Sequence, residues 1–322
     1  MYYVGVDLGA TNVRAVVGDE TATIVGRARD KTPSGPTGRA VTDVVLRVVR
    51  QACDHAGVTP TDVGGAGIGS MGTMDSTARV ITVPANVSTE IGSIPLVDPL
   101  SELLATDNVH LRNDTIAAVI GERFLTHPDT ENLAYITISS GIGVGIIANG
   151  EVVWGRDGNA GEIGHTTIDI HGFMECSCGR DGHWEAYCSG SNIPRFVRAL
   201  HQENTVETDL PIENSEFTAE HLFEYGGTDT FADHVIDRLA HLNTAGVANI
   251  VHAYDPSIIS IGGAVALNNP EHVVEPIKSR LDEAVLVEPP EISLSELGSQ
   301  AVLKGALTLP ITESTEVRTT VQ

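Results

Sequence analysis

The feature that most constrains the fold of this chain is a short unit that occurs twice, once at the N-terminus and once near the middle. In each copy an apolar run predicts a strand, a glycine-rich turn interrupts it, and a second apolar run predicts the returning strand. The first copy has its turn at residues 7–12, between runs at 2–7 and 13–17. The second has its turn at residues 139–145, between runs at 133–138 and 144–148. The repeat indicates two related half-structures.

Both turns have the composition of a phosphate-binding turn. Small residues expose backbone N–H groups that can hold phosphate oxygens, and one turn from each half could clamp a single nucleotide. Asp7 is acidic, so it would reach a phosphate only through a bound Mg²⁺ or its waters. An ordinary β-turn with a solvated aspartate stays an alternative, because the pattern is short. The candidate turn residues are Gly9, Ala10, Thr11, Asn12, Ser140, Gly141 and Gly143.

Two further glycine-rich segments follow predicted strands. Residues 67–72 formally match the G-x-G-x-x-G of dinucleotide sites, but that motif must open a helix, and residues 73–83 are β-branched and turn-like. We interpret the segment ending at Gly72 as a loop that lets a substrate approach the backbone. Gly262 and Gly263 close a predicted strand and form either a surface for a flat ligand or a simple turn. No lysine stands in a Walker A motif, so a phosphoryl transferase would hold ATP in another way.

Asp114 is the main candidate for a catalytic carboxylate. It stands between a predicted strand at 109–111 and a predicted helix at 115–124. Proteins with α/β folds place their sites at the carboxyl ends of strands, but an aspartate in this position can equally serve as a helix N-cap. The residues alone leave both roles open.

A cluster of potential metal ligands occupies residues 155–185. Its carboxylates, histidines and cysteines are Glu162, His165, Cys176, Cys178, His183 and Glu185. The many glycines fit neither a helix nor an alternating strand. A solvated polar loop would explain the glycines, but soft ligands at this short spacing favour metal binding.

Length and charge narrow the class of protein. With 322 residues, of which 41% are hydrophobic, the chain can bury the cores of two domains. No apolar run reaches the roughly 18 residues of a membrane span, and the N-terminus lacks a signal-peptide pattern, so we expect a cytoplasmic protein. The 43 acidic residues outnumber the 19 basic ones. Such a surface repels nucleic acid and anionic lipid, and we expect neither as a partner.

Segments along almost the whole chain resemble the ROK family of repressors and sugar kinases, and most of all its ATP-dependent glucokinases. The two turns lie in VGVDLGATNVRAVV and ITISSGIGVGIIANG, and Asp114 lies in LRNDTIAAVIGE. GNAGEIGH and CSCGRDGHWE cover the metal cluster. IISIGGAVA and LGSQAVLKGAL complete the series.

The resemblance implies an α/β protein with the actin-like ATPase (ribonuclease H-like) fold, in which two domains enclose a central cleft. We expect a small domain of residues 1–112 plus a C-terminal helix at about 306–322, and a large domain of residues 113–305. The resemblance further implies ATP and Mg²⁺ as cofactors, an adenosine loop at Gly262 and Gly263, and assembly into a homo-dimer or tetramer. The implied sugar-binding residues are Gly72, Asn86, Asn113, Asp114, Glu162, His165 and Glu185.

The chain departs from the family pattern in two places. The third cysteine of the zinc motif is His183 here. Imidazole is also a good zinc ligand, so His165, Cys176, Cys178 and His183 could still hold a structural Zn²⁺ in tetrahedral geometry, and a lost site is the alternative. Ser140 stands where the family has threonine, which keeps the hydroxyl.

The function implied is ATP-dependent phosphorylation of a hexose, with glucose favoured and Asp114 as general base. Kinases for fructose, N-acetylmannosamine or N-acetylglucosamine share these motifs. A ROK repressor would need a DNA-binding segment ahead of the strand that begins at Tyr2, and the acidic charge opposes DNA. An actin-like ATPase without a sugar substrate would not need Glu162, His165 and Glu185.

The charge balance predicts that stability depends on salt. A net charge of −24 makes the folded chain repel itself, and ions screen that repulsion. We therefore hypothesise a halophile's protein, whose melting temperature rises between dilute buffer and about 1 M KCl, where the screening length is short. Thermal unfolding followed by circular dichroism measures this. Greatest stability and activity in dilute buffer would contradict it.

Overall fold

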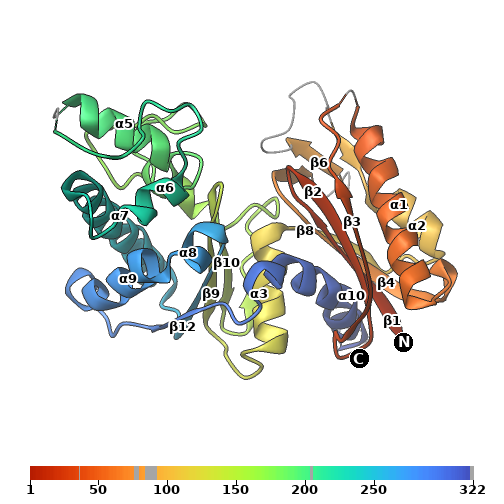
Figure 1. Ribbon diagram of the computed structural model, residues 1–322. Helices are drawn as coiled ribbons and strands as arrows, with labels where there is room; N and C mark the ends of the chain where they lie inside the picture. Colours follow the sequence, from red (N-terminus) through yellow and green to blue (C-terminus); the bar gives the residue numbers. More distant parts are fainter. Residues whose placement is uncertain (36, 76–79, 84–92, 204–205, 320–322) are drawn as a thin grey trace. The chain divides into compact units, whose positions relative to one another are not determined.

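The computed structural model describes residues 1–35, 37–75, 80–83, 93–203 and 206–319 (Figure 1). The chain forms two compact units. The first consists of Met1–Asp129, Val152–Ala160 and Gln300–Gln322, and the second of Thr130–Glu151 and Gly161–Ser299. The expected domains, with boundaries after residues 112 and 305, differ from this division. The reason is that α3 (Asp114–Leu125) packs on α10 (Ala301–Thr319) within the first unit.

The first unit contains a five-stranded sheet in the order β3-β2-β1-β4-β8. The strands β1 (Tyr2–Leu8), β2 (Asn12–Gly18) and β3 (Ile24–Lys31) are antiparallel neighbours, as the first predicted hairpin requires. β4 (Val63–Ser70) runs parallel to β1, and β8 (Val109–Asn113) runs parallel to β4. The carboxyl ends of β1, β4 and β8 therefore share one edge of the sheet.

Helices cover both faces of this sheet. α1 (Gly38–Ala56) packs on one face, where Val6 of β1 and Val45 of α1 belong to the same buried core. α10 packs against β1 and β4, and a Cβ at Gly67 of β4 would lie only 2.0 Å from the carbonyl oxygen of Ala306. The close approach of α10 to the sheet therefore depends on the missing side chain at Gly67. α2 (Val97–Leu104) packs against β8 and β4.

A second, three-stranded sheet lies in the first unit. It consists of β5 (Thr73–Asp75), β6 (Val80–Val83) and β7 (Ile94–Pro95), all antiparallel. The expectation that residues 73–83 are turn-like is wrong for the described part. Ile81 and Ile94 are each 1% exposed and pack into the core that contains α1, which gives these short strands their own apolar face.

The second unit repeats the strand order of the first. Its sheet has the order β11-β10-β9-β12-β13, with β9 and β10 antiparallel and β12 and β13 parallel to β9. The prediction of two related half-structures is thus confirmed. The strands are β9 (Leu133–Ile138), β10 (Ile142–Ala148), β11 (Glu151–Val152), β12 (Ile258–Gly262) and β13 (Glu291–Leu294).

Helices α7 and α9 pack together in the second unit. The sequence pattern predicts helices at 233–253 and 273–284, close to these two, but gives no prediction for the shorter helices or for β13. Among the described residues, no helix is long and apolar enough to cross a membrane. The helices are α4 (Glu185–Cys188), α5 (Ile193–Glu203), α6 (Ala219–Glu224), α7 (Thr230–Tyr254), α8 (Ala264–Asn268) and α9 (Pro270–Ala284).

The contact between α3 and α10 can be tested at Gly305. A Cβ there would lie 1.9 Å from the carbonyl oxygen of Ala117 in α3. Alanine normally stabilises a helix by about 1 kcal/mol relative to glycine, but here it would force the two helices apart. We expect Gly305→Ala to lower the free energy of unfolding by about 1–3 kcal/mol, the usual cost of overpacking. Chemical denaturation measures this, and a rise in stability would contradict the close packing.

Candidate functional site

The strand ends at one edge of the first sheet bring several predicted site residues together. Leu8 of β1 pairs with Ser70 of β4, and Ser70 pairs with Asn113 of β8, so the three strands end in one row. The first glycine turn, the loop that leads to Gly72 and the start of α3 follow from this row. Sequence separation is therefore no obstacle to a common site, because parallel strands carry their C-terminal loops to the same edge.

The first glycine turn is held at both ends by hydrogen bonds. The amide of Gly9 donates to the carbonyl oxygen of Asn12 at 3.0 Å, and the amide of Thr32 donates to the carbonyl oxygen of Thr11 at 3.0 Å. The Thr32 hydroxyl donates to the Gly9 carbonyl oxygen at 2.7 Å. Within the described residues, the amides of Ala10 and Thr11 donate to no protein acceptor. These two N–H groups are the ones a bound phosphate could use.

Asp7 lies in an ion pair. Its Oδ2 accepts a hydrogen bond from Nε of Arg14 at 2.8 Å and a second from Nη2 of the same guanidinium. Burial raises the pKa of Asp7, and the charge and hydrogen bonds of Arg14 act against that shift. A Mg²⁺ contact, as predicted for Asp7, would have to share the carboxylate with Arg14. The sequence interpretation missed this partner, although the two residues face each other in the hairpin register.

Asn113 and Asp114 divide the start of α3 between them. Asn113 is the N-cap: its Oδ1 accepts the amide of Thr115 at 2.9 Å and the Thr115 hydroxyl at 2.6 Å. Asp114 is the first helical residue, and its Oδ1 also accepts the Thr115 amide, at 2.8 Å. The N-cap role, which was one of two open roles for Asp114, is thus filled by Asn113. Asn113 is buried, whereas Asp114 is half-buried.

The second glycine turn is also held by backbone hydrogen bonds. Ser139 donates its amide to the carbonyl oxygen of Gly141 at 2.9 Å, and its own carbonyl oxygen accepts the amide of Gly190 at 2.7 Å. Ser140 is exposed. The amide of Ile142 donates to Oε2 of Glu185 at 2.8 Å, which ties the turn to one of the predicted sugar-binding carboxylates.

The glycine pair at the end of β12 lies beside this turn. β12 pairs in parallel with β9, and Gly262 lies opposite Thr137. Gly263 has a φ of 88°, and a Cβ there would lie 2.4 Å from the carbonyl oxygen of Ile138, so only glycine fits. The second sheet therefore carries its predicted nucleotide residues, with Gly143 in β10, on one edge.

The four predicted metal ligands converge. Their donor atoms all lie within 4.8 Å of one another. Sγ of Cys176 is 3.6 Å from Nδ1 of His165, and Sγ of Cys178 is 3.3 Å from Nδ1 of His183. A tetrahedral zinc with bonds of about 2.0–2.3 Å spaces its ligand atoms roughly 3.3–3.8 Å apart. The donor set and the two cysteine–histidine distances therefore fit Zn²⁺, with His183 in place of a third cysteine.

The two glutamates of the cluster flank the metal ligands. Oε2 of Glu162 lies 3.9 Å from Nε2 of His165, the ring nitrogen that does not face the cysteines. Oε1 of Glu185 lies 4.0 Å from Sγ of Cys176. Burial raises the pKa of Glu162, His165 lowers it, and Glu185 raises it further. Glu162, His165 and Glu185 thus lie close together in the second unit.

A buried hydroxyl supports the metal-binding loop. Tyr187 of α4 donates its hydroxyl to Oδ2 of Asp169 at 2.6 Å and accepts the amide of Met174 at 3.0 Å. The same carboxylate accepts the amides of His171 and Phe173, each at 3.0 Å. The loop between His165 and His183 is therefore tied to the helix that begins with Glu185. Neither Asp169 nor Tyr187 was predicted, since a lone aspartate and tyrosine carry no metal signature.

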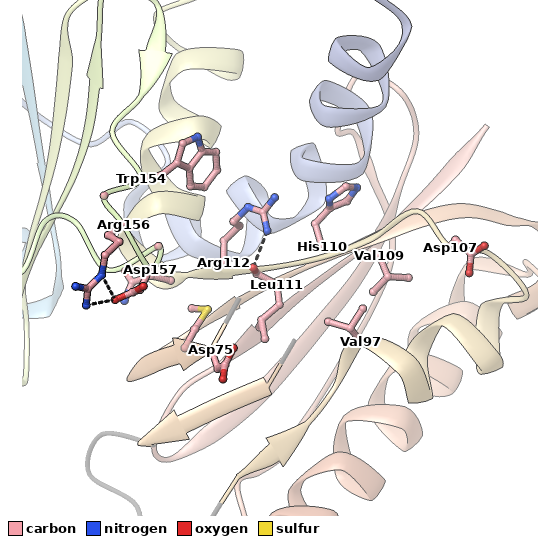
Figure 2. A pocket seen from close by; sticks show the side chains of 14 residues that line it. Asp75, Val97, Asp107, Val109, His110, Leu111, Arg112, Trp154, Arg156 and Asp157 are labelled. Atoms are coloured by element: carbon pink, nitrogen blue, oxygen red, sulfur yellow. Dashed lines mark hydrogen bonds and ion pairs between the residues drawn. The ribbon is translucent and has the colours of Figure 1, made fainter. Parts of the chain in front are cut away.

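The first unit also contains a groove of about 590 Å³ along the edge strand β8 (Figure 2). The guanidinium carbon of Arg112 lies 4.8 Å from the centre of the Trp154 ring, and Figure 2 shows the two side chains facing each other. Asn113 lines the same groove, so the groove reaches one of the predicted sugar-binding residues. Neither Trp154 nor Arg112 belongs to a motif that would have indicated a site residue. Asn86, another predicted sugar residue, lies outside the described residues.

Comparison with known proteins identifies the family of this chain. The model of the ROK family matches residues 3–313. The chain belongs to the ROK family. A glucokinase from Pyrobaculum calidifontis is 37% identical to this ROK protein over 309 residues, which are 95% of this chain and 94% of that one.

Solved ROK structures have the same fold. The ROK hexokinase from Thermus thermophilus superposes with a TM-score of 0.82 at 29% identity, over 98% of this ROK protein and all of that chain. The glucokinase from Streptomyces griseus, solved with glucose and AMPPNP, gives a TM-score of 0.77 at 27% identity over 96% and 99% of the two chains. This ROK protein therefore has the actin-like ATPase fold, and the predicted fold class is confirmed.

Proposed function

We propose that this ROK protein is an ATP-dependent hexokinase that phosphorylates glucose. The observation that carries the proposal is the similarity to the Pyrobaculum calidifontis glucokinase over nearly the full length of both chains. The glucose and nucleotide analogue in the Streptomyces griseus structure support the same substrates. Other hexoses are the alternative, because an N-acetylmannosamine kinase from Yersinia pestis is also 30% identical over 81% of this chain.

Each glycine turn offers backbone N–H groups to the phosphate donor. The amides of Ala10 and Thr11 in the first unit, and the turn that contains Ser140 and Gly141 in the second, supply N–H donors to phosphate oxygens. Mg²⁺, when bound with ATP, supplies charge neutralisation for the transferred phosphoryl group. The loop at Gly262 and Gly263 is the candidate for the adenosine contact; its missing side chains let the chain pass close to Tyr135 and Ile138. Phosphoryl transfer then depends mainly on position and charge.

Asn113 and Asp114 are the sugar-binding candidates of the first unit, and Asp114 accepts the proton. Asn113 contributes an amide, and Glu162, His165 and Glu185 contribute hydrogen bonds to the sugar hydroxyls. The attacking hydroxyl is a weak nucleophile, so a carboxylate within hydrogen-bond reach takes its proton as the bond to phosphorus forms. Asp114 is the candidate, since the N-cap role belongs to Asn113.

The metal ligands hold the sugar-binding histidine. His165, Cys176, Cys178 and His183 would hold Zn²⁺, which supplies a cross-link between the two ends of the loop when bound. His165 uses Nδ1 toward the cysteines and keeps Nε2 near Glu162. The ring orientation is thereby fixed for contact with the sugar.

The first prediction concerns Asp114. We expect Asp114→Asn to reduce kcat by about 10²–10⁴-fold, the usual contribution of a general base. The KM for glucose should change little, because Asn113 and the second-unit carboxylates remain. A coupled assay with a panel of hexoses measures both constants and identifies the preferred sugar. Asp62→Asn, an exposed site in the same unit, is the control, and wild-type turnover in Asp114→Asn would remove the general-base role.

The second prediction concerns His183. We expect the purified protein to carry zinc, and His183→Ala to weaken zinc affinity by more than about 100-fold, since loss of an outer-shell partner alone can cost that much. His183→Cys should retain the metal, because it restores a soft ligand. Chelator competition and the absorption spectrum of the Co²⁺-substituted protein measure this without reference to activity. The control is Cys188→Ala, which changes a buried cysteine outside the cluster. If His183→Ala binds zinc as tightly as wild type, His183 is not a ligand.

A further inference from the structure

A row of cationic side chains runs beside the first glycine turn. In the sheet register Asp7 lies opposite Arg14, and Arg14 lies opposite Arg29. One step closer to the turn, Asn12 lies opposite Lys31. The strands β2 and β3 that carry these residues lie side by side (Figure 1). The row therefore holds three cations and one carboxylate.

These residues share one face of the sheet. Val13 and Ala15 of β2 belong to the core that contains α1, and Ala28 of β3 packs against it. Because neighbouring residues of a strand point to opposite faces, the cations at positions 14, 29 and 31 point to the other face. On that face α10 covers Val16, through Leu303 and Leu307. The turn end of the row is left exposed: Arg29 and Lys31 are exposed, and Arg14 is one-third exposed.

The charges in the row are only partly balanced. Arg14 pairs with Asp7, but Arg29 donates to the neutral Oδ1 of Asn12, at 3.2 and 2.9 Å. Among the described residues, no ion pair joins Arg29 or Lys31 to a carboxylate. Two arginines directly opposite each other on neighbouring strands destabilise a sheet. A bound anion would remove that cost.

Protection of the edge strand does not explain the row. β3 is an edge of the sheet, and charged side chains prevent edge strands from pairing with other chains. Lysine is used most often for that purpose, but carboxylates also serve, and this chain has 43 acidic residues against 19 basic ones. From that composition alone, an edge that is merely charged would be mostly acidic in this protein. Instead, Arg27, Arg29 and Lys31 alternate along the exposed face of β3.

The turn and the row form one continuous surface. Thr32, next to Lys31, holds the turn through its amide and its hydroxyl. The free amides of Ala10 and Thr11 and the side chain of Lys31 therefore lie at the same end of the hairpin. Residues directly opposite each other on neighbouring strands have Cβ atoms about 4.5–5.5 Å apart. The extended side chains of Arg29 and Lys31 are longer than this spacing. A phosphate chain that begins on the turn amides would pass within reach of both.

We propose that Arg29 and Lys31, supported by Arg14, extend the phosphate site of the first turn and bind the phosphate chain of the donor. This inference rests on the proposed function only in assigning the turn to a phosphate donor. Arg29 offers a guanidinium fork, and Lys31 a mobile ammonium group. Asn12 orients the Arg29 guanidinium through its side-chain oxygen. The ligand is an oligophosphate, either the tail of a nucleoside triphosphate or inorganic polyphosphate.

The test compares Arg29→Gln, Lys31→Gln and the double variant with wild type. We expect each single change to raise the KM for Mg·ATP roughly fivefold to tenfold, the scale of one partly exposed charge-assisted contact. The KM for glucose and kcat should stay within about twofold of wild type. Inorganic tripolyphosphate should compete with ATP on wild type and lose most of that competition in the double variant. Assays at two salt concentrations, each with folding verified by circular dichroism, should show the larger effect in lower salt.

Controls decide between a site and a general charge effect. Arg27→Gln removes the same charge from the same face of the same strand, but one row further from the turn, opposite Val16. It should leave the KM for ATP unchanged, and an equal rise in Arg27→Gln would overturn the proposal. Arg29→Lys should recover part of the affinity. An unchanged KM and unchanged tripolyphosphate competition in the double variant would also overturn it.

The outcome separates this inference from the proposed function. If wild type transfers no phosphate to any hexose, the proposed function fails. Calorimetry of tripolyphosphate binding to wild type and to the double variant then still decides whether the row binds oligophosphate. If wild type phosphorylates glucose and the variants bind tripolyphosphate as well as wild type, only the inference fails.

Discussion

The constraint on which the candidate site depends is the parallel alignment of three strands in each sheet. The central strands β1 and β9 each end in a glycine turn, and their parallel neighbours end at the same edge. Leu8, Ser70 and Asn113 stand in one row, so the loops after them start together. The same construction places Gly262 next to the end of β9. Strand direction alone thus gathers residues that are far apart in the sequence.

The glycine turns themselves must also be rigid. A turn that binds phosphate through backbone amides must keep those amides pointed outward without a ligand. In the first turn Thr32 clamps the carbonyl oxygens of Gly9 and Thr11, so that these carbonyls are already satisfied. In the second, the Glu185 carboxylate accepts the amide of Ile142. Each turn is therefore shaped by a residue outside it, and Glu185 links the second turn to the metal cluster.

Much of this could be predicted from the sequence. The two related half-structures were predictable from the repeated hairpin, because a strand, a glycine turn and a returning strand form a local sequence pattern. The metal ligands were also predictable, since His165, Cys176, Cys178 and His183 are chemically unusual and close in sequence. The packing roles of Gly305 and Gly67 could not be predicted. Gly305 contacts Ala117, and Gly67 contacts Ala306, and both contacts join residues far apart in the sequence.

The partners of the predicted residues were harder to foresee than the residues themselves. Asp7 was identified as a site residue, but its ion pair with Arg14 depends on the hairpin register. Tyr187 and Asp169 are ordinary residues whose role arises only when the loop folds. The short helices α5 and α6 were missed, because tertiary packing stabilises such helices more than local propensity does.

Asp114 shows why a site residue needs its neighbours to be understood. Asn113 caps α3, so the carboxylate of Asp114 is not needed to begin the helix, although it also accepts the Thr115 amide. The N-terminus of a helix favours negative charge, which suits a carboxylate at the first helical position. In phosphoryl transfer with a loose transition state, catalysis is mostly positioning and electrostatic stabilisation, so the position of the carboxylate matters more than its basicity. A carboxylate fixed on the first turn of a helix meets that requirement better than a stronger base on a flexible loop.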